Sequence, residues 1–81
     1  MRYDKLPYER IRNLRIDNNF TQEHIAKSLN LKQNTYCQYE TGASKYPIDV
    51  LIKLAKFYDT SVDYLLGLTD NPAPYGRCNN L

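Results

Sequence analysis

The sequence predicts an all-α domain of five short helices packed around one core. Apolar residues recur at helical spacing in short segments, which are separated by residues typical of helix caps and turns. Strand-like alternation of apolar and polar residues is absent, and no segment repeats another. A chain of 81 residues is expected to form one small domain with a modest core and a stability of only a few kcal/mol.

The first two helices are expected over residues 8–18 and 22–30. Apolar residues share one face of the first helix, and the Asn-Asn pair that closes it favours a turn. Thr21 fits the N-cap of the second helix, because its hydroxyl can accept a hydrogen bond from a free N–H of the first turn. That helix ends near Asn30, a residue type that tolerates left-handed backbone.

The remaining helices are expected over residues 33–41, 48–59 and 62–67. Gly42 stops the first of these, because glycine adopts the left-handed conformation at no steric cost. A proline opens the next helix, where its missing N–H removes no hydrogen bond. Ser61 fits the N-cap of the last helix.

These helices define a domain over residues 1–68, followed by a flexible C-terminal tail over residues 69–81 that is rich in Pro, Asn and Gly. No apolar run approaches the roughly 20 residues that span a bilayer, and no signal peptide is evident, so the protein is expected in the cytoplasm without membrane contact. Cys37 and Cys78 lack the spacing of a metal site or a redox pair and are expected to be free thiols.

Composition also limits the classes of function. The net charge is +2, and residues 1–45 hold eight lysines and arginines against five acidic residues, a bias that is compatible with a polyanionic partner. One histidine, no Gly-rich phosphate loop and no useful pair of carboxylates argue against an enzyme. We therefore expect no catalysis, no cofactor, no metal and no small-molecule ligand.

The third helix has an unusual outer face. The helix contains one charged residue, Glu40, whereas ordinary exposed helices are rich in Lys and Glu. Its other polar or weakly polar positions are Gln33, Asn34, Thr35, Cys37, Gln38 and Thr41. Such side chains suit hydrogen-bonding edges, and the helix, tight turn, helix arrangement is that of a helix-turn-helix, whose second helix enters the DNA major groove.

The segments RIRNLR, FTQEHIAKSLNL, TYCQYETG and PIDVLIKLAKFYDTSVDYLLG together resemble the phage Cro/repressor-type, or XRE, helix-turn-helix family over about residues 8–68. This resemblance implies a five-helix, lambda-repressor-like DNA-binding domain. It also implies a transcriptional regulator, with double-stranded DNA as its partner. Tyr36 occupies a position that is more often Ile or Val in this family.

The resemblance implies roles for individual residues. The positions that read base edges are Gln33, Asn34, Cys37 and Gln38. The positions that contact phosphates are Gln22, Lys32, Thr35 and Lys45, and Thr35 could contact a base instead. Arg15 and Glu40 match positions that form an internal ion pair. Because an amide can bond adenine N6 and N7 together, amides on this helix favour adenine contacts.

We expect the protein to be a repressor that binds a near-palindromic operator as a homodimer, because one module of this size buries too little surface to bind tightly alone. The expected dimer surface consists of Val62, Tyr64, Leu65 and Leu68. Two alternatives stay open at this point: an antitoxin or other protein-binding module on the same scaffold, and the DNA-binding fragment of a longer ligand-sensing protein.

Overall fold

The computed structural model describes residues 9–74, and these residues form five helices and no strand. The helices are α1 (Glu9–Asp17), α2 (Gln22–Ser28), α3 (Gln33–Thr41), α4 (Ile48–Tyr58) and α5 (Val62–Leu65). Each boundary that the sequence predicted lies within two residues of the observed one. The all-α, five-helix prediction is therefore confirmed. Over the described residues, no helix is long and apolar enough to cross a membrane.

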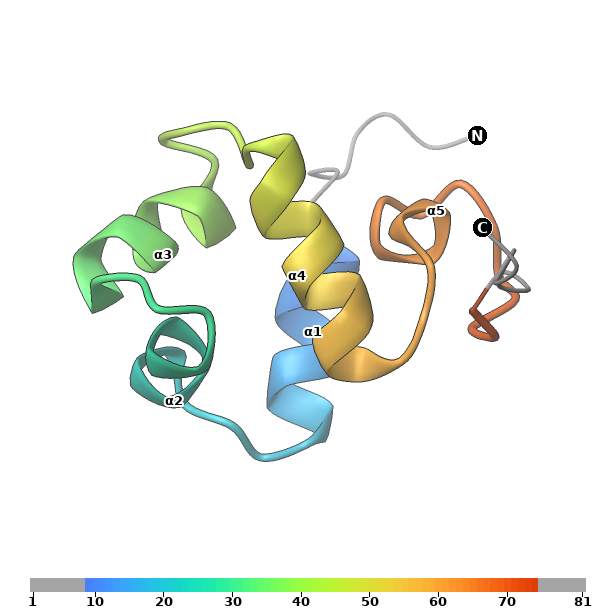
Figure 1. Cartoon of the computed structure of the whole chain (residues 1–81), viewed down its shortest axis with the longest axis horizontal. Coiled ribbons are helices and arrows are strands. Elements are labelled where there is room, and N and C mark those ends of the chain that lie inside the picture. The colour runs from blue at the N-terminus through green and yellow to red at the C-terminus, as the bar shows by residue number, and fades with distance from the viewer. Residues whose placement is uncertain (1–8, 75–81) are drawn as a thin grey trace, which may run out of the picture.

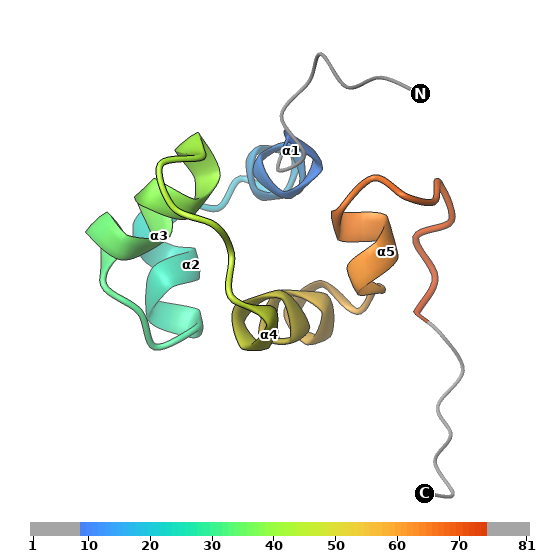
Figure 2. The same ribbon diagram turned by 90° about the horizontal axis from the view of Figure 1, so that it is seen from above.

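The helices surround a small interior (Figure 1). α1 and α4 occupy the middle of the domain, with the α2–α3 pair on one side of them and α5 on the other (Figure 2). α3 therefore lies at an outer edge of the molecule, far from α5. This arrangement leaves one face of α3 free while the other packs inward.

Four helices end in the same way. Each is followed by a residue with positive φ, and these residues are Asn19 (60°), Asn30 (61°), Asp59 (56°) and Gly67 (78°). In each case the next residue's N–H reaches back to a carbonyl of the last turn, as in Leu31 to Ala26 at 2.7 Å and Phe20 to Arg15 at 3.0 Å. This is the Schellman arrangement, and it satisfies carbonyls that a helix end would otherwise leave unbonded.

The helix starts differ from one another. Thr21 Oγ1 accepts a hydrogen bond from the His24 N–H at 3.0 Å, and Ser61 Oγ accepts one from the Tyr64 N–H at 3.0 Å, as predicted. Lys32 precedes α3 and makes no side-chain cap hydrogen bond. Because a missing cap costs a helix about 1 kcal/mol, α3 depends more on its contacts with the rest of the domain.

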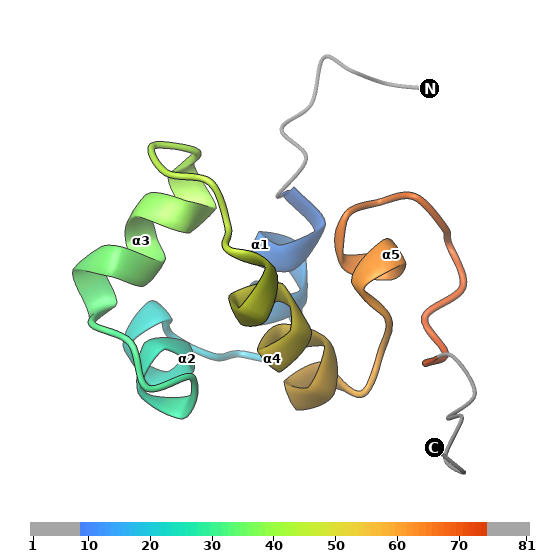
Figure 3. The same ribbon diagram turned by 45° about the horizontal axis from the view of Figure 1, so that its top comes forward.

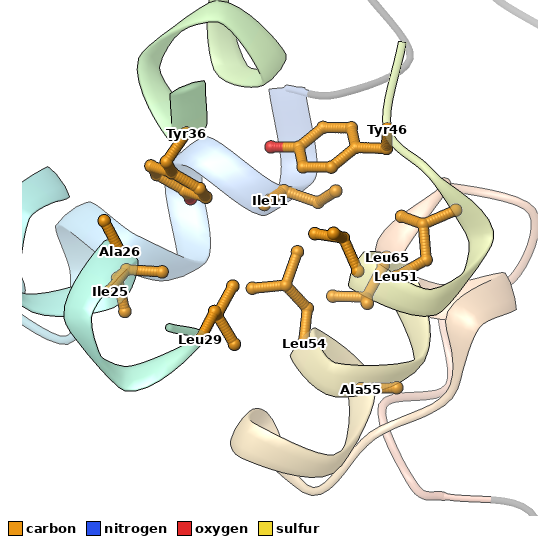
Figure 4. Packing of buried hydrophobic residues seen from close by; sticks show 11 residues of the cluster. Ile11, Ile25, Ala26, Leu29, Tyr36, Tyr46, Leu51, Leu54, Ala55 and Leu65 are labelled. Carbon is orange, nitrogen blue, oxygen red and sulfur yellow. The ribbon is translucent and has the colours of Figure 1, made fainter. Parts of the chain in front are cut away.

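The core receives side chains from all five helices (Figure 4). Its buried apolar members are Ile11, Ile25, Ala26, Leu29, Tyr36, Tyr46, Val50, Leu51, Leu54, Ala55 and Leu65. Leu65 is 0% exposed, so its assignment to a dimer surface was wrong. The four-residue α5 is too short to be stable alone; Leu65 anchors it in the core, and the partly buried Val62 packs against the same cluster.

The chain beyond α5 stays in contact with the domain. Arg10 of α1 donates hydrogen bonds to the carbonyls of Thr69 at 2.7 Å and Tyr64 at 3.3 Å, and it pairs with Asp70 at 3.2 Å. Thr60 Oγ1 donates to the Pro72 carbonyl at 2.6 Å. The domain's contacts therefore continue past residue 68, where the sequence predicted a flexible tail to begin. Cys78 and the rest of that tail beyond residue 74 lie outside the described residues.

Candidate nucleic-acid interface

The unit of α2, the following turn and α3 stands at one edge of the domain (Figure 3). The turn is held by Asn30 in left-handed backbone and by the Leu31 N–H, which bonds the Ala26 carbonyl. Ala26 itself is 1% exposed, and its small side chain permits close packing where α3 crosses. Leu31 packs against the core and so fixes the chain as it leaves α2.

The outer face of α3 carries amide side chains. Gln33, Asn34 and Gln38 are exposed, whereas Thr35 and Cys37 are half-buried between them. The side chains of Gln33 and Asn34 make no hydrogen bond with any described residue. Gln38 differs, because its amide oxygen accepts a hydrogen bond from Ser44 Oγ at 3.3 Å. All four predicted base-reading residues therefore retain some exposure on one helix.

A lysine stands at each end of this face. Lys32 immediately precedes α3, Lys45 follows it in the loop, and both are exposed. Glu40, the only charged residue within α3, is 4% exposed and faces inward. The result is an uncharged, hydrogen-bonding strip between two lysines, an arrangement suited to a surface whose backbone is anionic and whose centre presents polar edges.

Arg15 and Glu40 form a two-point ion pair that joins α1 to α3. Arg15 Nε donates to Glu40 Oε2 at 2.7 Å, and Arg15 Nη2 donates to Glu40 Oε1 at 3.1 Å. Arg15 Nη1 also donates to the Phe20 carbonyl at 3.0 Å, which ties the end of α1 into the same group. Paired, parallel contacts of this kind fix orientation as well as distance.

Two further side chains complete this group, and sequence reasoning missed both contacts. Tyr36 is 0% exposed and donates its hydroxyl proton to Glu40 Oε2 at 2.6 Å. Gln22 Nε2, from the first residue of α2, donates to Glu40 Oε1 at 3.1 Å. We call Arg15, Gln22, Tyr36 and Glu40 the Glu40 cluster. The four-residue spacing of Tyr36 and Glu40 on one helix was a signal for the first contact; nothing in the sequence indicated the second.

The Glu40 cluster also sets the protonation of its members. Burial alone would raise the pKa of Glu40, but hydrogen bonds from Arg15, Tyr36 and Gln22 outweigh it and hold the pKa below its ordinary value. Burial is the main cause that raises the pKa of the Tyr36 hydroxyl, so this group stays protonated and remains a donor. The Glu40 carboxylate therefore remains charged, and both of its oxygens accept hydrogen bonds from within the domain.

Gln22, which the sequence predicted to contact a phosphate, uses part of its amide inside the domain. Its side chain is half-buried, and one of its two amide N–H groups already donates a hydrogen bond to Glu40. The other amide N–H remains for an outside acceptor. The Glu40 carboxylate thus joins the start of α2 to α3.

The residues predicted for the dimer surface fall into three groups. Leu68 is 70% exposed, Val62 and Tyr64 are half-buried, and Leu65 lies inside the core. The Arg10 guanidinium sits over the Tyr64 ring at 4.4 Å from its centroid. Leu68 is therefore the member of this set that is most available to a partner.

Comparison with known proteins adds independent information. A family described as "Helix-turn-helix domain" matches residues 8–71. YobD, an HTH-type transcriptional regulator of Bacillus subtilis strain 168, is 42% identical over 73 residues, which cover 90% of this chain and 65% of the relative. RstR, a cryptic phage CTXphi transcriptional repressor of Vibrio cholerae, is 35% identical over 57 residues, which cover 70% of this chain and 51% of the relative.

A solved structure also matches the fold. The crystal structure of a transcriptional regulator from Listeria innocua superposes with a TM-score of 0.72 at 29% identity, and the match covers 82% of this chain and 62% of that one. The chain thus spans between 51% and 65% of the length of these three proteins.

Proposed function

Because the chain belongs to the helix-turn-helix domain family, we propose that it is a sequence-specific, double-stranded DNA-binding transcriptional regulator that acts as a repressor. The observation that carries this proposal is the exposed amide face of α3 between two lysines, held to α1 and α2 by the Glu40 cluster. The similarity to two transcriptional regulators and a phage repressor supports it. The proposal assigns no catalysis or cofactor and places the protein in the cytoplasm.

In the proposed complex, α3 enters the major groove and its side chains contact base edges. Gln33, Asn34, Cys37 and Gln38 face the bases in this arrangement. Lys32, Lys45, Thr35 and the free N–H of Gln22 contact the flanking phosphates, as do the backbone N–H groups at the start of α2. Phosphate contacts fix the register of the domain on the duplex, and base contacts give the sequence preference.

The proposed regulator binds as a homodimer. A single α3 contacts few base pairs, so two copies on half-sites about one helical turn apart are needed for tight binding. We assign the dimer surface to the exposed Leu68 with the half-buried Val62 and Tyr64. α5 and α3 lie on opposite sides of the domain (Figure 2), so pairing through α5 leaves both reading faces free.

Selection of bound duplexes from a random DNA library, at about 150 mM salt, tests the function. We expect recovery of a near-palindromic site whose sequence preference weakens in the Gln33→Ala variant. Lys45→Ala should weaken binding to all duplexes and reduce the slope of log K against log salt concentration by about 1. The control variant Lys53→Ala, on α4, should change neither quantity. Recovery of no duplex above background would refute the proposal. Co-elution of two differently tagged copies tests the dimer separately.

A second candidate function is a protein-binding module, such as an antitoxin. Ile48 is 75% exposed and Ile52 is 44% exposed, and the two lie one turn apart on α4, an apolar pair that is unusual on a solvated helix. This function would be favoured if charge reversal at Lys45 left DNA binding unchanged, or if the wild-type protein selected no duplex.

A further inference from the structure

Among the amides of α3, only that of Gln38 forms a hydrogen bond with another described side chain. Its Oε1 accepts a hydrogen bond from the Ser44 hydroxyl at 3.3 Å, whereas its Nε2 makes no hydrogen bond with a described residue. Gln33 and Asn34, on the same face, keep both amide atoms free of bonds to described residues. The three amides are therefore not equivalent in what they offer to a base.

The position of Ser44 is fixed by the end of α3. Gly42 adopts φ of 86° and turns the chain back. The Ser44 N–H then donates to the backbone carbonyl of Gln38 at 3.0 Å, and the Thr41 hydroxyl donates to the same carbonyl at 3.3 Å. Ser44 is half-buried and is thus linked to Gln38 twice, once through its backbone and once through its side chain. Its hydroxyl is held beside the Gln38 amide by the turn itself.

We propose that Ser44 is a specificity-determining residue, which turns the Gln38 amide so that it offers donors and selects guanine in the half-site. This inference rests on the proposed DNA-binding function. An amide is planar, so directing its oxygen toward Ser44 directs its nitrogen away from the loop. The two N–H bonds of Nε2 are then the groups that Gln38 presents to the groove.

The N–H donors that Gln38 presents match the edge of guanine better than that of adenine. A guanine presents two acceptors, N7 and O6, in the major groove, and adenine presents one acceptor, N7, and one donor, the N6 amino group. A glutamine that reads adenine needs its oxygen and its nitrogen on the base edge together. The Ser44 bond takes one of the two lone pairs of Gln38 Oε1 and turns this oxygen toward the loop, which disfavours that arrangement at Gln38. The adenine preference that the sequence predicted for amides thus applies to Gln33 and Asn34, and not to Gln38.

The expected effect is moderate, because the Ser44–Gln38 bond is exposed and competes with water. Loss of such a bond changes an equilibrium by about two- to fivefold. We therefore expect Ser44→Ala to shift the preference between guanine and adenine by about that factor, toward adenine, at the one base pair that Gln38 reads.

The experiment begins with the duplex selected by the wild-type protein. Selection with Gln38→Ala identifies the base pair whose discrimination depends on Gln38. Dissociation constants are then measured for four duplexes that differ only at that pair, using the wild-type protein, Ser44→Ala and Thr41→Val. The last variant removes the neighbouring hydroxyl that contacts the Gln38 backbone and leaves the side-chain bond intact, so it is the matched control.

The inference is supported if the wild-type protein prefers guanine at that pair, Ser44→Ala shifts the preference toward adenine, and Thr41→Val does not. It is overturned if the wild-type protein prefers adenine there, if Ser44→Ala changes nothing, or if Gln38→Ala loses discrimination at no base pair. In those cases selection of a specific duplex leaves the DNA-binding function intact. Failure to select any duplex overturns the proposed function and this inference with it.

Discussion

The Tyr36→Phe variant tests the Glu40 cluster with the smallest change in structure, because it removes one oxygen and keeps the buried ring. The lost hydrogen bond, at 2.6 Å, runs from a fully buried donor to a charged acceptor that is 4% exposed. Hydrogen bonds to charged groups contribute about 1.5–3 kcal/mol. Because Glu40 Oε2 keeps its bond from Arg15, we expect a loss near the lower end, about 1.5 kcal/mol.

For a domain of this size, 1 kcal/mol corresponds to about 4–8 °C in Tm, so the variant should melt roughly 6–12 °C lower. Urea denaturation followed by circular dichroism measures the free energy directly. Tyr39→Phe is the matched control, because Tyr39 lies on the same helix, is half-buried and donates no hydrogen bond to a described residue. We expect its loss to be under about 0.5 kcal/mol. Equal losses in the two variants would refute the role assigned to the Tyr36 hydroxyl.

Three further predictions concern other parts of the domain. The lowered pKa of Glu40 means that its contribution to stability is present above its ordinary pKa of 4.5 and is lost as the pH falls through its folded value. The urea midpoint should therefore decline toward about pH 3, and less steeply in Glu40→Gln; equal slopes would contradict this. Arg10→Ala should lower stability by roughly 1–2 kcal/mol and speed amide exchange over residues 69–72, and unchanged exchange would show that Arg10 does not hold that segment. Leu68→Glu should leave monomer stability within about 0.5 kcal/mol and abolish the dimer in sedimentation, and a persisting dimer would move the interface elsewhere.

Helix positions were predictable from sequence because each helix has a local signal at its ends. Thr21 and Ser61 act as caps through bonds within one turn, and Asn30 supplies the left-handed residue that the turn requires. Such contacts depend on neighbours in sequence, so they can be read along the chain. The resemblance to a helix-turn-helix family, predicted from four segments, is confirmed by the family match over residues 8–71.

Contacts between distant residues were harder to predict. Arg10 binds the chain 54 to 60 residues away, and neither its helix nor the Pro-rich segment it holds carries a signal for that contact. Leu65 was assigned to the surface because apolar residues in a short final helix serve a core and an interface equally well. Its complete burial follows from where α5 docks, which is a property of the folded chain.

The Glu40 cluster has a consequence for handling the protein with nucleic acid. Its charges lie away from solvent, where added salt screens poorly, whereas lysine–phosphate contacts on the exposed surface are screened strongly. If the proposed function is correct, a concentrated salt wash strips bound DNA from an intact domain, and dilution restores binding without refolding. A change in ionic strength alone can thus release the DNA without unfolding the domain, in purification as in binding assays.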